Sequence, residues 1–175
     1  MRTIPKPQPG EYAPYAIQYI GLLPDDGQVL KHLAESFRSL RALLAGLPEE
    51  RLLHRYAPGK WSVKEVVQHI SDDERIYAYR ALRFARGDAT ELPGFEQEPY
   101  AEASEADRRS IASLLAELGA VRRATIQLFA GLPRAALLRQ GVANGNPMSV
   151  RAAVYHIAGH ELHHVRILRE SYLLS

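Results

Sequence analysis

Apolar residues recur every three or four positions over four long stretches of the chain, and this spacing constrains the fold more than any other feature. In the first stretch, residues 26–45, they are Leu30, Leu33, Phe37, Leu40 and Leu44. Residues three and four apart share one face of an α-helix, so the spacing predicts a helix with one buried side. No run of alternating apolar residues indicates a β-strand. The sequence therefore predicts an all-α protein.

Three further helices follow from the same spacing and from their end signals. The second is expected over residues 62–86, because the Ser62-Val-Lys-Glu65 segment is a capping box and Gly87 ends the helix. The third is expected from about Ser104 to residue 130, and the fourth from a cap at Ser149 to about residue 173. The connection between the second and third is too long for a tight hairpin and suits a crossover. These features predict a four-helix bundle with long crossover connections.

The first 25 residues differ from the rest of the chain because they are rich in proline. Proline lacks the amide donor that helices and sheets need, so residues 1–25 are expected to form an extended N-terminal arm. Tyr12, Tyr15 and Tyr19 favour an arm that lies on the body of the protein. The remaining residues, 26–175, are enough for one bundle domain with one core.

Composition excludes several classes of function. The formal net charge is only +2, with basic and acidic residues interspersed, which argues against a nucleic-acid-binding surface. The chain has no cysteine, so disulfides, thiolate metal sites and cysteine nucleophiles are absent. No apolar run approaches the ~20 residues of a membrane span, and the first residues lack the apolar segment of a signal peptide. We therefore expect a cytoplasmic enzyme or binding protein.

Four histidines and a glutamate lie within the segment His-Ile-Ala-Gly-His-Glu-Leu-His-His, residues 156–164. His160 and His164 are four apart, a spacing that lets two imidazoles on one helix face bind one metal ion. They share a face with the apolar residues of this helix and are expected to point into the core. His156 is expected at the edge of that face, and His163 toward water or a partner chain.

Two interpretations of the buried pair remain open. Buried imidazoles need partners for their nitrogen atoms, and either core hydrogen bonds or a metal ion would supply them. The segment also contains the H-E-x-x-H pattern of zinc proteases, but no third ligand follows His164 at a suitable place on the helix. In addition, Glu161 points about 100° away from His160 on a helix. The protease interpretation is therefore rejected, and any third ligand must come from upstream.

His69 is the best upstream candidate because it lies among apolar residues of the second helix, whereas His32 is expected on a polar edge and His54 in a loop. Asp73 follows one turn later and could be a fourth ligand, a base, an acceptor behind a ligand, or a solvated carboxylate. Its neighbours Asp72 and Glu74 are expected to pair with arginines. Three protein ligands leave a coordination position open, which is typical of catalytic metal sites.

Two segments of the chain resemble the DinB-like (DinB/YfiT) superfamily of four-helix proteins. They are GKWSVKEVVQHISDDERIYAYRALRFARGD and GVANGNPMSVRAAVYHIAGHELHHVRIL, and the resemblance extends over residues 26–173. It implies a damage-inducible bundle with an unusual helix order, often a homodimer. It also implies a divalent ion, commonly zinc or nickel, held by His69, His160 and His164. Relatives include thiol-dependent transferases and a maleylpyruvate isomerase.

The functional prediction is a metal-dependent enzyme that acts on small molecules, of the thiol S-transferase or hydrolase type. The three histidines would hold the ion, Asp73 would assist proton movement, and a low-molecular-weight thiol is a candidate cofactor. One alternative is a stress-induced metal-binding protein without turnover. Another is a metal-free helical interaction protein.

Overall fold

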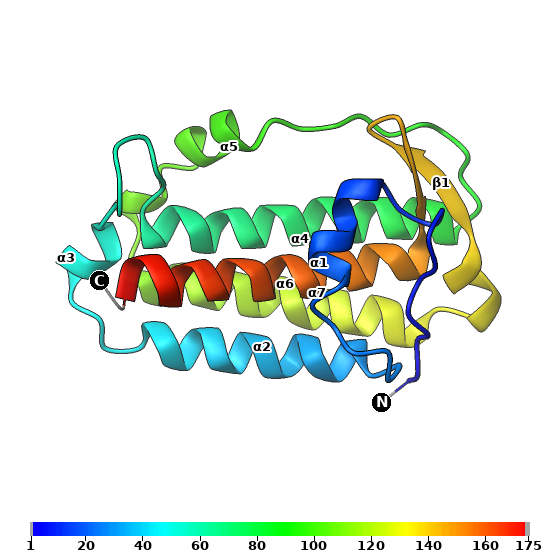
Figure 1. Cartoon of the computed structure of the whole chain (residues 1–175), viewed down its shortest axis with the longest axis horizontal. Helices are drawn as coiled ribbons and strands as arrows, with labels where there is room; N and C mark the ends of the chain where they lie inside the picture. Colours follow the sequence, from blue (N-terminus) through cyan, green and yellow to red (C-terminus); the bar gives the residue numbers. More distant parts are fainter. Residues whose placement is uncertain (1, 174–175) are drawn as a thin grey trace.

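Four long helices pack side by side in the computed structural model, which describes residues 2–173 (Figure 1). They are α2 (Val29–Leu44), α4 (Val63–Ala85), α6 (Ile111–Gly131) and α7 (Val150–Ile167), and α7 is extended by a π-helical turn over Leu168–Leu173. Helix α4 packs against α6 and α7, and α2 packs against the same two helices. The predicted four-helix bundle is confirmed. Within the described residues, no helix is long and apolar enough to cross a membrane.

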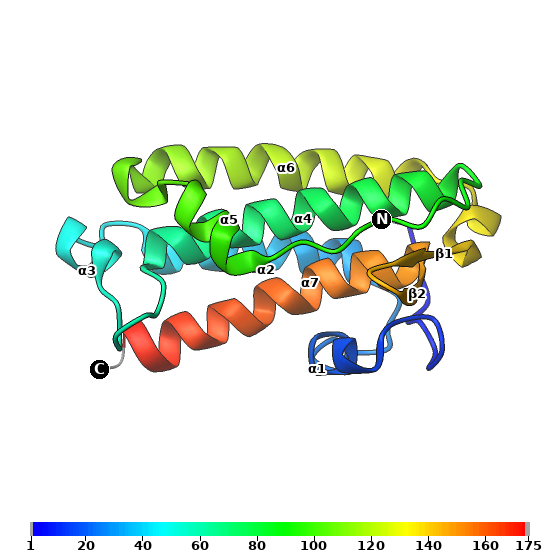
Figure 2. The same ribbon diagram turned by 90° about the horizontal axis from the view of Figure 1, so that it is seen from above.

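The connection between α4 and α6 is a long crossover, as predicted. Figures 1 and 2 show it running back along the length of the bundle, so that α6 lies parallel to α4. It contains α5 (Gln97–Ala103) and a 3-10 turn (Ala106–Arg108). The prediction that α6 begins near Ser104 is wrong. Glu105 adopts a left-handed backbone conformation with φ of 47°, which interrupts the helix, and Ser110 caps the new start by accepting from the Ser113 amide.

The predicted caps of α4 and α7 are confirmed. At Ser62 the capping box is complete, since the Ser62 hydroxyl accepts from the Glu65 amide and the Glu65 carboxylate accepts from the Ser62 amide. At the start of α7, Ser149 accepts from the Ala152 amide. Both caps satisfy amides that have no partner within the helix, and so fix where each helix begins.

A β-hairpin precedes α7, contrary to the expectation of no strand. Strands β1 (Gln140–Ala143) and β2 (Asn146–Ser149) pair antiparallel. Asn144 and Gly145 join them with φ values of 51° and 69°, the left-handed conformations that tight hairpin turns require. The hairpin also binds the crossover, because Leu92 exchanges backbone hydrogen bonds with Val142 and Asn144. A short 3-10 helix, Arg134–Leu138, lies just before it.

The N-terminal segment lies across α7 and is not wholly extended (Figure 1). Residues 14–20 form a 3-10 turn (Pro14–Ala16) and α1 (Ile17–Ile20), because Pro14 has the fixed φ that suits a first helical position. Ile20 is fully buried and the Ile4 amide donates to the Gly27 carbonyl. These contacts hold the arm on the bundle. A further short helix, α3 (Glu49–Leu53), follows α2.

Charged residues also lie in the core, where the four long helices meet. The Arg122 guanidinium on α6 donates to Glu74 on α4 at 2.8 Å and lies 2.8 Å from Glu161 on α7. It also donates to the Leu33 carbonyl of α2, and all three charged residues are at most 2% exposed. The predicted pairing of Glu74 with an arginine is confirmed. This network joins all four helices at one point.

Candidate metal centre

Three imidazoles from two neighbouring helices meet in the middle of the bundle. His69 lies on α4, and His160 and His164 lie on successive turns of α7. The Nε2 atom of His160 is 3.0 Å from that of His69 and 3.1 Å from that of His164. Each residue offers a ligand atom, and these atoms all lie within 4.8 Å of one another. The structure therefore brings together the three residues that the sequence analysis selected as metal ligands.

The chemistry of this group suits a divalent ion. Zinc-to-nitrogen bonds of ~2.0–2.1 Å place two ligands of a tetrahedral ion about 3.3 Å apart, close to the separations here. Burial lowers the pKa of His69 and His164, and lowers that of His160 to about 3. The three rings are therefore neutral at neutral pH, and a neutral imidazole keeps a free nitrogen lone pair. The residues present fit a three-histidine metal site with an open position.

Asp73 lies directly behind this group and is 4% exposed, so the interpretation of a solvated carboxylate is wrong. Its Oδ2 atom is 3.4 Å from His160 Nδ1 and 3.5 Å from His156 Nε2. Burial raises the pKa of Asp73, but the His160 and His156 rings outweigh it and bring the pKa below its ordinary value. An ionised Asp73 can accept a hydrogen bond from the N–H group at His160 Nδ1, which leaves Nε2 unprotonated toward the other two rings.

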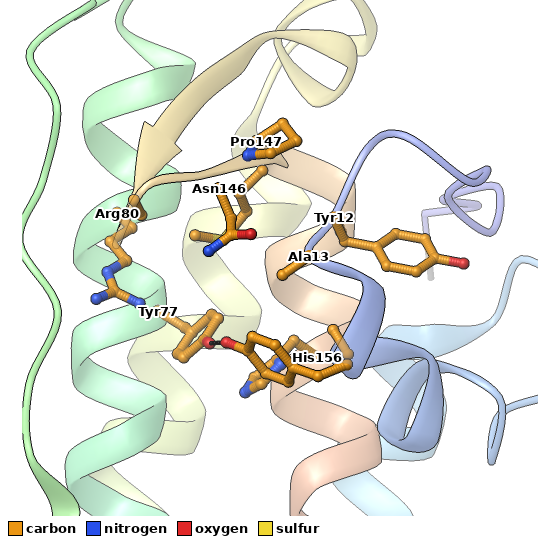
Figure 3. A pocket seen from close by; sticks show the side chains of 12 residues that line it. Tyr12, Ala13, Tyr77, Arg80, Asn146, Pro147 and His156 are labelled. Carbon is orange, nitrogen blue, oxygen red and sulfur yellow. Dashed lines mark hydrogen bonds between the residues drawn. The ribbon is translucent and has the colours of Figure 1, made fainter.

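The other two histidines of α7 have different surroundings. His156 is 4% exposed, more deeply buried than the edge position expected from the sequence. Its ring stacks on that of Tyr77, with the two ring centroids 3.7 Å apart (Figure 3). Neither ring nitrogen of His156 makes a hydrogen bond within residues 2–173. His163 is half-buried and its ring contacts Tyr19 at 5.3 Å. Neither residue belongs to the group of three.

His32 and His54 are also outside the group. The His32 ring pairs with Asp26 at 2.9 Å near the start of α2. His54 follows α3 and its ring contacts Tyr172. Their predicted places on a polar edge and in a loop are confirmed.

The position of Glu161 explains why the zinc-protease pattern does not apply to this chain. The residue is fully buried, accepts a hydrogen bond from Ser36 and pairs with Arg122. A zinc protease of this pattern needs that carboxylate beside the ion as a general base. Here it faces the centre of the bundle and is held there.

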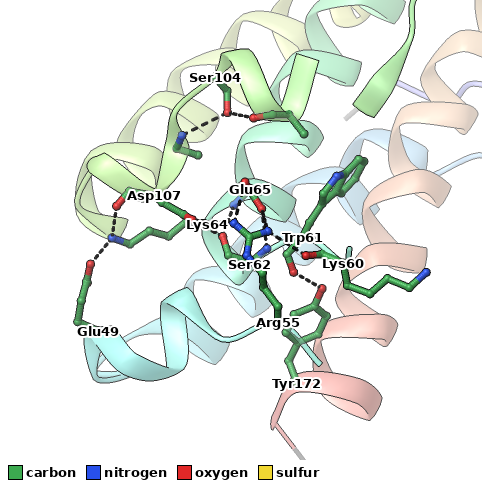
Figure 4. Close-up of polar contacts among 12 residues, drawn as sticks. Glu49, Arg55, Lys60, Trp61, Ser62, Lys64, Glu65, Ser104, Asp107 and Tyr172 are labelled. Carbon is green, nitrogen blue, oxygen red and sulfur yellow. Dashed lines mark hydrogen bonds and ion pairs between the residues drawn. The ribbon is translucent and has the colours of Figure 1, made fainter. Parts of the chain in front are cut away.

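Two aromatic side chains that the sequence analysis did not assign to the site enclose the histidines. The centroid of the Tyr19 ring, from the arm, lies 5.1 Å from the centroid of the His156 ring and 5.3 Å from that of the His160 ring. The Trp61 ring lies 4.6 Å from His69, and its Nε1 atom donates to Glu98 at 2.9 Å. The Tyr172 hydroxyl donates to the Trp61 carbonyl at 2.6 Å and so helps to fix this wall of the site (Figure 4).

A cavity of about 310 Å³ adjoins the three-histidine group. It is large enough for a small molecule and is at the lower end of the volumes of ligand sites. The arm, α4, the crossover, the hairpin tip and α7 all contribute to its wall, which consists of Tyr15, Tyr19, His69, Asp73, Tyr77, Arg80, Gly94, Phe95, Glu96, Gln97, Asn144, His156 and His160. The histidine group is thus accessible from a space that can hold a substrate.

Comparison with known proteins identifies the family. The sequence model of the DinB superfamily matches residues 32–168. The chain belongs to the DinB superfamily. The DinB resemblance expected from the sequence is therefore confirmed. Comparison with curated proteins gives no match.

A solved structure shares the fold of this chain. It is described as "YfiT from Bacillus subtilis is a probable metal-dependent hydrolase with an unusual four-helix bundle topology". The two structures superpose with a TM-score of 0.74 at 18% sequence identity, and the match covers 83% of this chain and 85% of that one. At this identity the likeness establishes the shared fold.

Proposed function

We propose that this DinB protein is a divalent-metal-dependent enzyme that acts on a small molecule. His69, His160 and His164 are the proposed ligands. The observation that carries the proposal is the convergence of three neutral imidazoles beside a cavity, with His69 and His160 buried and His164 half-buried. A divalent ion held there would act as a Lewis acid toward a group bound at the open position. Zinc and nickel are the proposed ions, since both favour imidazole ligands.

The surrounding residues have supporting roles in this proposal. Asp73 is a positioning residue, because its carboxylate fixes the proton of His160 on Nδ1 and orients the ring. Tyr19 and Trp61 pack against the ligand rings and keep bulk water from two sides of the group. The cavity orients the substrate. The proposed reaction classes are hydrolysis and thiol S-transfer, and a low-molecular-weight thiol would occupy the cavity in the second.

Metal analysis of the purified protein tests the ligand set. We expect about one zinc or nickel ion per chain in the wild type and loss of stoichiometric metal in His69→Ala and His160→Ala. His32→Ala is the matched control, because His32 lies away from the group and should leave the metal content unchanged. Stoichiometric metal in all three variants would contradict the ligand assignment.

A second experiment separates an enzyme from a metal-binding protein without turnover. Cobalt substituted at the site should change its visible spectrum when azide or a small thiol is added, because an open position accepts them. A screen of ester hydrolysis, and of several thiols against a common electrophile, then distinguishes the two reaction classes. A visible spectrum of the cobalt protein that stays unchanged with every added ligand would favour the non-catalytic alternative.

A further inference from the structure

Arg80, on α4, is a buried arginine without an acidic partner. It is 5% exposed, and no carboxylate within residues 2–173 lies within 4.0 Å of its nitrogen atoms. Arg122, buried to a similar degree, contacts two carboxylates. None of the Arg80 nitrogen atoms is among the buried polar atoms of residues 2–173 that lack a partner, so those without a hydrogen bond face open space. The guanidinium of Arg80 is therefore open to a ligand and, unlike that of Arg122, has no carboxylate beside it.

The contacts of Arg80 orient the guanidinium and leave part of it available. Its Nη2 atom donates to the Pro93 carbonyl at 2.7 Å, and its centre lies 5.0 Å from the centroid of the Tyr77 ring (Figure 3). Its Nε and Nη1 atoms make no hydrogen bond within the described part of the chain. A guanidinium held by two fixed contacts loses little entropy when an anion binds, and it matches the planar geometry of a carboxylate.

The same residue lines the cavity that adjoins the three histidines. Asp73 and Glu96 line this cavity too, but neither forms an ion pair with Arg80, and Asp73 faces His156 and His160 instead. The two acids therefore do not occupy the free edge of the guanidinium. A bound anion would occupy this edge.

The position of Arg80 along α4 sets the length of such a ligand. Asp73, at the level of the histidines, and Arg80 are seven residues apart, which is about 10 Å along a helix at 1.5 Å per residue. Because helix side chains lean toward the N-terminus, the Arg80 guanidinium lies nearer to the histidines than this spacing, 5.0 Å from the Tyr77 ring centroid. A shorter acid therefore suits the cavity of about 310 Å³. Its one end would contact Arg80 and its other end would lie near His160.

We propose that Arg80 binds the carboxylate of a small organic acid whose opposite end lies beside the three-histidine group. The second half of this assignment rests on the proposed function, and the first half does not. Arg80 is thereby a specificity-determining residue that selects anionic molecules and places them along α4.

Binding of defined carboxylates tests the assignment. Succinate and benzoate are the probes and succinamide is the neutral control, measured by titration calorimetry on metal-free and on zinc-loaded protein. We expect at least one acid to bind and succinamide not to bind. Arg80→Met, which keeps the length of the side chain, should weaken the acid at least about tenfold, because charge-assisted hydrogen bonds contribute about 1.5–3 kcal/mol.

Arg83→Met is the matched control, because Arg83 lies on the same helix, pairs with Asp88 and does not line the cavity. It should bind the acid as the wild type does. Should Arg80→Met fail to fold, phenylglyoxal labelling of wild-type protein replaces it, and the acid should protect Arg80 but not Arg83. Equal affinity in Arg80→Met, equal binding of succinamide, no binding of either acid, or unprotected labelling would each overturn the proposal.

These outcomes are separate from those that test the metal site. Acid binding that depends on Arg80 in a protein without metal affinity would refute the proposed function alone. A protein that takes up one metal ion but binds acids independently of Arg80 would refute this inference alone.

Discussion

Gly159 is the residue of α7 over which the N-terminal arm passes, and replacing it with alanine gives a sharp test of the packing. A Cβ atom at residue 159 would lie 2.1 Å from the Tyr19 carbonyl oxygen and 2.4 Å from its carbon. These are backbone atoms, so no side-chain rotation can relieve the contact. Since Cβ atoms keep at least about 3.0 Å from such neighbours, the arm must move away from α7 by about 1 Å.

Two effects of opposite sign decide the stability of Gly159→Ala. Alanine in a helix interior is normally about 1 kcal/mol more favourable than glycine. Against this, overpacking a tight contact costs about 1–3 kcal/mol, and here it disturbs Ile20 and Ala16, which are at most 4% exposed. We expect a net cost of about 1 kcal/mol, lowering the melting temperature by about 3 °C, since 1 kcal/mol corresponds to about 2–4 °C at this size.

Thermal unfolding together with hydrogen exchange measures the effect. Amides of residues 16–23 should exchange faster in Gly159→Ala, while those of α4 and α6 should be unchanged. Gly131→Ala is the control, because a Cβ there meets nothing within 4 Å, and its melting temperature should match or slightly exceed that of the wild type. A Gly159→Ala protein as stable as the wild type, with unchanged exchange in the arm, would refute the reasoning.

Three further predictions concern the core, the arm and the histidines. Arg122→Met leaves Glu74 buried without its cation and should cost about 3–5 kcal/mol in thermal unfolding, whereas the exposed neighbour Arg123→Met should cost little. Burial raises the pKa of Glu11, but its bonds to the start of α7 bring it below 4.5. The stability advantage of wild type over Glu11→Gln should therefore be full above about pH 4.5 and vanish as pH falls through the lower, folded-state pKa, as measured by urea unfolding. His163→Ala should retain stoichiometric metal by elemental analysis, since residue 163 is outside the converging group; loss of metal would contradict this.

The bundle could be predicted from the sequence because its signals are local and repeated. The apolar spacing and the serine caps each depend on residues within a few positions of one another, so helix starts at Ser62 and Ser149 were correct. The start of α6 was missed because nothing in the sequence marks Glu105 as left-handed. The hairpin was missed because two four-residue strands are too short to show alternation, although Asn144-Gly145 is a turn signal.

The histidine group could also be predicted, because helical spacing alone orients His160 and His164, and His69 shares the apolar face of α4. The burial of Asp73 could not be predicted from the sequence. A carboxylate one turn beyond His69 can face water or the core, and only the position of α7 decides between them. Tyr19 and Arg80 were missed for a similar reason. Their place in the site depends on the path of the arm and of the crossover, which no local pattern specifies.

The histidines and much of the cavity wall come from different parts of the chain, and this separation has a consequence for how such proteins diversify. The histidines stand on two helices of the bundle, whereas much of the remaining wall comes from the arm, the crossover and the hairpin tip. Insertions or exchanges in those connecting segments would alter which molecules are admitted without moving α4 against α7. The same group of histidines could therefore adjoin cavities of different shape, through changes only in the chain that lies outside the four long helices.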